Sequence, residues 1–122
     1  MGEQRGEGRA AVTPWTPEEA AEARRLAREA DARRARAKAA VASGEATAGE
    51  VLGLAREDKA IGRIKARQLA MAVPGIGAAR AEAALAEARV APDRRISSLG
   101  PRQRAALAEA LDRAAGAEGA GR

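Results

Sequence analysis

The stretch Val73-Pro74-Gly75-Ile76-Gly77-Ala78-Ala79-Arg80 decides how this chain is organised. An apolar helix end runs into Pro74, and two glycines then flank one aliphatic residue before an alanine-rich segment. Glycine lacks a Cβ, so the backbone can turn tightly at Gly75 and Gly77, while Ile76 is expected to point inward and anchor the turn. The helix that follows leaves its first N–H groups unpaired, and such donors favour an anion. The alternative is a plain connection between helices, where Pro-Gly turns are common.

Composition limits the classes of function. The 122 residues are expected to form one domain with tails, and 22 basic against 17 acidic residues favour a polyanionic partner, either nucleic acid or an anionic membrane surface. No apolar run approaches the roughly 20 residues of a membrane span. The chain has no Cys and no His, which argues against a metal site, a cofactor-dependent reaction and an acid–base enzyme. Large aliphatic side chains are sparse, so the core should be small.

A long basic helix is predicted over residues 16–43, after a polar tail at 1–15 that is expected to be disordered. Thr16 can cap this helix, Pro17 suits its first position, and Glu19 can complete a capping box. Its second half carries a run of basic residues without acids between them. This run is either a solvated helix face or a second surface for phosphates, and its members are Arg33, Arg34, Arg36 and Lys38.

Shorter helices are predicted for the rest of the chain. Thr47 and Glu50 form a second capping-box pattern, and helices are expected over 60–73, over 78–89, in a short segment starting at Arg94, and from Pro101 to about Arg113. The residues 114–122 are predicted to be a disordered tail. No run alternates with period two, so no sheet is expected. The predicted fold is all-α, with a long N-terminal helix followed by a compact bundle over 44–113.

Four segments occur in an order that carries a family resemblance. They are Ile61-Gly62-Arg63-Ile64-Lys65, Val73-Pro74-Gly75-Ile76-Gly77, Val90-Ala91-Pro92-Asp93-Arg94-Arg95-Ile96 and Leu99-Gly100-Pro101-Arg102-Gln103-Arg104. This series resembles the actinobacterial integration host factor family, whose members are nucleoid-associated proteins with a helix-two-turn-helix module. The resemblance covers roughly residues 16–112. It implies a monomeric, non-enzymatic, cytoplasmic protein of the nucleoid that binds duplex DNA largely without sequence specificity, and bends or compacts it.

The resemblance also implies which residues contact DNA. Its turn maps onto Gly75, Ile76 and Gly77, and its arginine pair maps onto Arg94 and Arg95. The sequence departs from the pattern at Ala78 and Ser97, where basic residues are usual, and alanine replaces several large aliphatic residues. Together with nearby cations and the run in the first helix, the predicted DNA-binding set is Gly75, Ile76, Gly77, Arg80, Arg94, Arg95, Arg63, Lys65, Arg33, Arg34, Arg36 and Lys38.

Two other functions fit the sequence. The same module could bind structured RNA by backbone shape, since Trp15 is the sole aromatic residue and no stacking platform is available. Alternatively, the long helix could dock a protein partner, although it lacks the sustained apolar heptads of a coiled coil. Reading of base edges is not expected, because the chain has no Asn and few Gln side chains.

Overall fold

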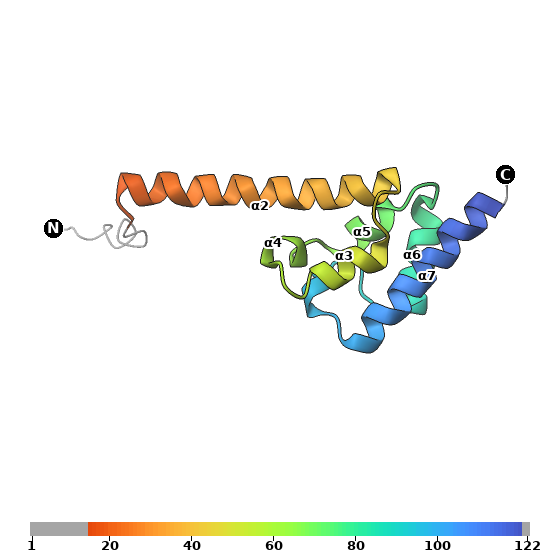
Figure 1. Cartoon of the computed structure of the whole chain (residues 1–122). Helices are drawn as coiled ribbons and strands as arrows, with labels where there is room; N and C mark the ends of the chain where they lie inside the picture. The colour runs from red at the N-terminus through yellow and green to blue at the C-terminus, as the bar shows by residue number, and fades with distance from the viewer. Residues whose placement is uncertain (1–14, 121–122) are drawn as a thin grey trace.

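The computed structural model describes residues 15–120, with side chains described up to Gly116. The N-terminal tail predicted at residues 1–15 therefore lies, apart from Trp15, outside the described residues. Helix α2 (Pro17–Ser43) is a long rod, and its N-terminal half extends beyond the rest of the molecule (Figure 1). Within the described residues it is followed by α3 (Ala48–Leu54), α4 (Lys59–Gly62), α5 (Ala66–Ala72), α6 (Gly77–Glu87), the 3-10 turn η1 (Ile96–Ser98) and the longer α7 (Pro101–Ala120). The all-α prediction is confirmed.

Local signals start the first two helices as predicted. Thr16 Oγ1 accepts a hydrogen bond from Glu19 N at 3.1 Å, and Glu19 returns a carboxylate to Thr16 N at 2.9 Å. The same reciprocal pair joins Thr47 and Glu50 at the start of α3. Each box satisfies N–H groups that a helix leaves unpaired, so both helices begin where the side chains dictate.

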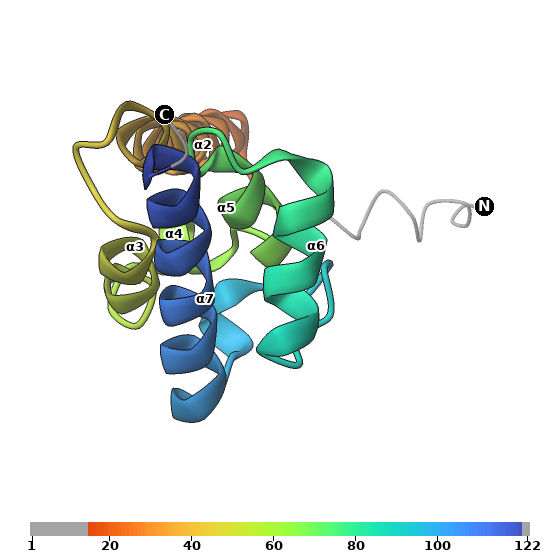
Figure 2. The same ribbon diagram turned by 90° about the vertical axis from the view of Figure 1, so that its right-hand side faces the viewer.

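The core lies among α3, α5, α6 and α7, and α7 packs against both α3 and α6 (Figure 2). Its largest fully buried side chains are Leu52, Ile64, Leu69, Leu85, Ile96, Leu107, Leu111 and Val51. From α2, Ala37 and Val41 join this core, so the C-terminal part of that helix packs as a component of the bundle. Among the described helices, none has the length and apolar character that crossing a membrane requires.

The single helix predicted over 60–73 is wrong, because the chain breaks between α4 and α5. Ile64 leaves the helix and its carbonyl accepts a hydrogen bond from Ile96 N at 2.9 Å, while Ala66 N donates to Arg94 O at 2.8 Å. A Cβ on Gly62 would lie 2.8 Å from Ser97 Cβ, so α4 ends where this segment presses against η1. Tertiary pairing has replaced the helical hydrogen bonds that the local pattern favoured.

Two further boundaries differ from the predictions. The segment from Arg94 does not start a helix; Arg94 and Arg95 are extended or turn residues, and the 3-10 turn begins at Ile96. The disordered tail predicted at 114–122 is also wrong over most of its length, since α7 continues to Ala120. Ala114 and Ala115 are partly buried against the core. Because alanine also has the highest helix propensity, the helix continues past Arg113. Residues 121–122 lie outside the described part.

Candidate nucleic-acid interface

The glycine turn between α5 and α6 has the conformation that its sequence requires. Gly75 and Gly77 have φ of 76° and 70°, in the left-handed region that favours glycine. A Cβ on Gly77 would meet nothing within 4 Å, so the backbone angle rather than space demands glycine there. Ile76 is buried, as predicted, and anchors the turn in the core. The backbone angles of the two glycines and the burial of Ile76 together fix the place at which α6 begins.

The start of α6 presents backbone donors. No side chain caps this helix, in contrast to α2 and α3. The helix has 11 residues, and its first N–H groups carry the partial positive charge of the helix dipole. Arg80 lies exposed in the following turn. The turn therefore combines N–H donors with a nearby guanidinium, an arrangement suited to an anion.

A backbone bridge aligns two cations from distant segments. Lys65 and Arg95 face each other in an isolated antiparallel bridge, flanked by the hydrogen bonds from Ala66 N and Ile96 N described above. Residues directly opposite in such a pair have side chains on the same face. Both side chains are exposed, and neither makes a hydrogen bond or ion pair with a described residue. Because like charges opposite each other are destabilising on their own, the bridge is a natural site for an anion.

The adjacent arginines Arg94 and Arg95 differ in their surroundings. Arg94 is half-buried and donates from Nε to Ser98 Oγ at 2.8 Å and from a terminal nitrogen to Ser98 O at 2.6 Å. Ser98 Oγ in turn donates to Arg95 O at 2.7 Å. Arg94 therefore braces η1, whereas Arg95 projects its guanidinium into solvent.

An exposed strip along α5 joins the bridge to the turn. Lys65 lies at the N-terminal end of α5 and Val73 at its C-terminal end, roughly 12 Å apart at about 1.5 Å of rise per residue. Between them lies an open groove of about 510 Å³. The groove residues are Lys65, Arg67, Gln68, Met71, Pro92 and Asp93. The predicted DNA-binding set does not include Arg67, Gln68 or Met71, although the spacing of Lys65, Gln68 and Met71 follows one helix face.

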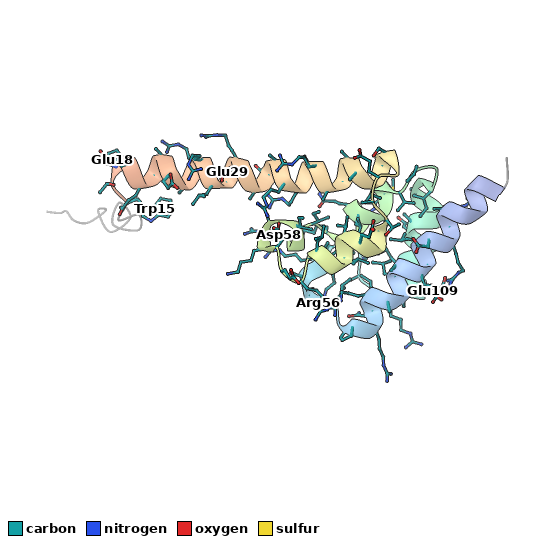
Figure 3. All side chains as sticks on the ribbon, in the orientation of Figure 1. Trp15, Glu18, Glu29, Arg56, Asp58 and Glu109 are labelled. Atoms are coloured by element: carbon teal, nitrogen blue, oxygen red, sulfur yellow. The ribbon has the colours of Figure 1, made fainter. Side chains whose placement is uncertain are left out.

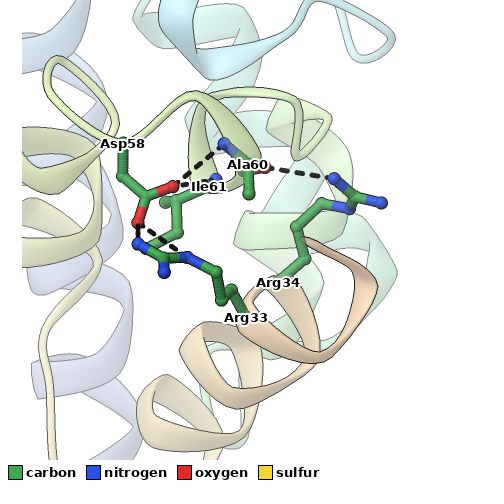
Figure 4. Close-up of polar contacts among 5 residues, drawn as sticks. All are labelled: Arg33, Arg34, Asp58, Ala60 and Ile61. Carbon is green, nitrogen blue, oxygen red and sulfur yellow. Dashed lines mark hydrogen bonds and ion pairs between the residues drawn. The ribbon is translucent and has the colours of Figure 1, made fainter. Parts of the chain in front are cut away.

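The cations predicted on α2 do not gather into one surface. Arg33 donates to Asp58, with an Nε–Oδ2 distance of 3.1 Å, and Arg34 donates to Ala60 O at 3.3 Å and pairs with Asp31 (Figure 4). Arg36 and Lys38 make no ion pair within the described part of the chain, but a separation of two residues sets them on opposite sides of a helix. Arg63, in contrast, is exposed beside the Lys65–Arg95 bridge and has no described partner.

Asp58 is the carboxylate that holds α2 to α4. It accepts from Arg33, and its Oδ1 also accepts from Ala60 N at 2.9 Å and Ile61 N at 3.1 Å, so that it caps α4 (Figure 4). The hydrogen bonds from Arg33 and then from Ile61 N hold the pKa of this carboxyl below its ordinary value. One side chain thus both starts a helix and fastens the long rod to the bundle.

Comparisons with known proteins find similar chains. The family model of the S13-like H2TH domain matches residues 41–111. The integration host factors of Mycolicibacterium smegmatis and Mycobacterium tuberculosis are 39% and 40% identical over 89 and 86 residues, which cover 71% and 69% of this chain and 85% and 82% of theirs. That of Streptomyces coelicolor is 33% identical over 97 residues, 80% of this chain and 91% of its own.

The chain belongs to the actinobacterial integration host factor family. A solved structure of sIHF bound to an 8-base-pair palindromic DNA is also similar, with a TM-score of 0.66 and 29% identity, over 71% of this chain and 98% of that one. The resemblance noted in the sequence is confirmed. The match to the S13-like H2TH family model begins at Val41, so nearly all of α2 lies outside the matched module.

Proposed function

We propose that this chain is an architectural, non-enzymatic protein of the nucleoid that binds duplex DNA through its phosphates. The observation that carries the proposal is the Lys65–Arg95 bridge, which aligns two unpaired cations on one face. Support comes from the integration host factor relatives and from the DNA-bound sIHF structure. Phosphate contacts position a protein without reading bases, so binding is largely independent of sequence.

The proposed contact surface follows α5. Lys65, Arg95 and Arg63 neutralise phosphates at one end, while the N–H groups at the start of α6 and Arg80 receive a phosphate at the other. In this proposal the two ends, which α5 separates, contact the two edges of one groove of the duplex. Holding both edges is a means of bending or compacting the duplex.

In this proposal the arginines of α2 have another role. Arg33 and Arg34 hold the rod against α4 instead of contacting phosphate, and Arg36 and Lys38 add at most separate, weaker contacts. The second surface predicted on α2 is therefore a minor part of the proposal. Deleting residues 1–30 would leave Arg33 and Arg34 in place, and DNA affinity should change little.

The test is DNA binding across a salt series with random-sequence duplexes. About four neutralised phosphates predict a slope of about −4 in a plot of log affinity against log salt. A response that does not change with salt would contradict the proposal. Structured RNA serves as the competitor: if it displaces duplex DNA at equal concentration or below, the RNA-binding alternative replaces the DNA proposal.

A further inference from the structure

A second cationic pocket lies beside the proposed interface, between the α3–α4 turn, α4 and η1. Its volume is about 400 Å³, and the side chains of Arg56, Lys59, Arg63 and Ser97 line it together with Ala55 and Glu57. Figure 3 shows Arg56 on the side of the α3–α4 turn that faces away from α2. The sequence reasoning assigned Arg63 to the interface but gave no role to Arg56 or Lys59.

The charges around this pocket are unbalanced. Arg56, Lys59 and Arg63 are all exposed, and none makes an ion pair or side-chain hydrogen bond within the described residues. Glu57 is the one carboxylate in the pocket wall, which leaves an excess of two positive charges. Lys59 begins α4 and Arg63 directly follows its last residue, a separation of four residues at which like charges on a helical turn repel. An anion between them would relieve that repulsion.

The adjacent carboxylate of Asp58 does not balance these cations, because it is directed toward α2. Its oxygens accept from Arg33 and from the first N–H groups of α4, on the side of the turn opposite Arg56 (Figures 3 and 4). The contact with Arg33 thereby directs the carboxylate of Asp58, which precedes Lys59 in the sequence, away from the pocket. The positive charge of the pocket is a consequence of how α2 docks.

The segments that line the pocket lead directly into the Lys65–Arg95 bridge. Arg63 lines the pocket and lies two residues before Lys65, and Ser97 lines it two residues after Arg95. The close approach of Gly62 to Ser97 fixes η1 on α4, so the two walls are held together. The Ser97 hydroxyl makes no hydrogen bond with a described residue and can donate one.

We propose that this pocket binds a further phosphate of the same duplex, held by Arg56, Lys59 and Arg63 with the Ser97 hydroxyl as a donor. This inference rests on the proposed DNA binding and extends its contact surface from the bridge to the α3–α4 turn. The ligand proposed is a backbone phosphate, because Arg, Lys and Ser side chains commonly donate to phosphate oxygens and three cations can share one such group.

The experiment measures binding of the full-length chain to a random-sequence duplex across a salt series. The double variant R56A/K59A should lower the salt slope by about 0.9, since the pocket holds one phosphate and each lost phosphate contact removes about 0.9. The matched control is R24A/R28A, which removes the same charge from exposed α2 residues without described partners. If the two double variants give the same slope and affinity, the pocket does not bind phosphate.

A second pair of variants tests the pocket with all its cations present. Ser97→Glu places a carboxylate in the pocket and should weaken DNA binding at least fivefold, while Ser97→Gln should bind like the unmodified chain. Equal affinities of these two variants would overturn the inference. Failure of the unmodified chain to bind DNA with salt dependence would instead overturn the proposed function. An effect of R56A/K59A with structured RNA alone would assign the pocket to RNA, against the inference.

Discussion

Two pairs of adjacent arginines in this molecule have opposite surroundings. Arg33 and Arg34 lie on α2, and both are engaged by acceptors of the same chain, chiefly Asp58 and Asp31. Arg94 and Arg95 lie before η1; Arg94 is bound to Ser98, and Arg95 is without a side-chain partner in the described structure. Of these four cations, only Arg95 is available to an external anion among the described residues.

The comparison shows that a run of arginines does not by itself identify a binding surface. An arginine with a carboxylate within reach is held, and binding an external anion requires breaking that contact. Arg33 and Arg34, the α2 pair, meet acids from their own helix and from the α3–α4 turn. In the loop pair, Arg94 and Arg95, the first side chain meets the hydroxyl and carbonyl of Ser98 and the second meets no described acceptor.

The loop pair depends on the contact between Gly62 and η1. Gly62→Ala should destabilise the fold by about 2 kcal/mol, because the new Cβ would lie 2.8 Å from Ser97 Cβ and 3.1 Å from Ala55 O. Thermal unfolding measures the loss. Gly53→Ala is the control: its Cβ would meet nothing within 4 Å, so the same change in α3 should stabilise. A destabilised G53A beside an unaffected G62A would contradict this packing.

The α2 pair depends on Asp58. Asp58→Ala should cost about 1–2 kcal/mol of stability, because it removes the cap of α4 together with the Arg33 contact. Asp58→Asn keeps a capping oxygen and should cost less. Chemical denaturation measures both, with the exposed Asp93→Ala as the neutral reference. If D58A matches D93A, Asp58 does not fasten α2.

Within the loop pair, substitutions of Arg95 and of Arg94 should have different effects on DNA binding. Arg95→Ala should weaken binding severalfold and lower the salt slope by about 0.9, as expected for one phosphate. Arg94→Ala should loosen η1 and weaken binding with little change in slope, since its guanidinium is held by Ser98. Salt titrations of both variants distinguish them. A slope change in R94A equal to that in R95A would make Arg94 a direct contact as well.

The smallest effect is acid sensitivity at Asp58. The pKa of Asp58 is lowered in the folded chain by Arg33 and by the N–H of Ile61. The ionised carboxylate therefore contributes to the stability of the fold at pH values above the unfolded-state pKa of about 3.9. This contribution is lost as the pH falls through the lower, folded pKa. The difference in melting temperature between the unmodified chain and D58N should therefore shrink below about pH 4. A constant difference down to that range would show that the carboxylate charge adds nothing.

Sequence patterns predicted the features whose contacts are local. The capping boxes at Thr16 and Thr47 join residues three apart, and the glycine turn depends on the backbone angles of Gly75 and Gly77 and on one apolar anchor. Such contacts are specified by neighbouring residues whatever the rest of the chain does. The all-α fold and the family were predicted from them and from the order of four short segments.

Tertiary structure alone decided which cations are available. The Lys65–Arg95 bridge, the Arg33–Asp58 contact and the approach of Gly62 to Ser97 join segments far apart in the sequence. Each of these contacts outweighs a local preference. The Lys65–Arg95 bridge and the approach of Gly62 to Ser97 break the helix predicted over 60–73. The Arg33–Asp58 contact engages one of the arginines of α2 and directs the Asp58 carboxylate away from its neighbour Lys59. The sequence by itself determined that the chain is helical, basic and built around a glycine turn. Packing decided where its positive charge faces solvent, because charges are neutralised by what lies near in space.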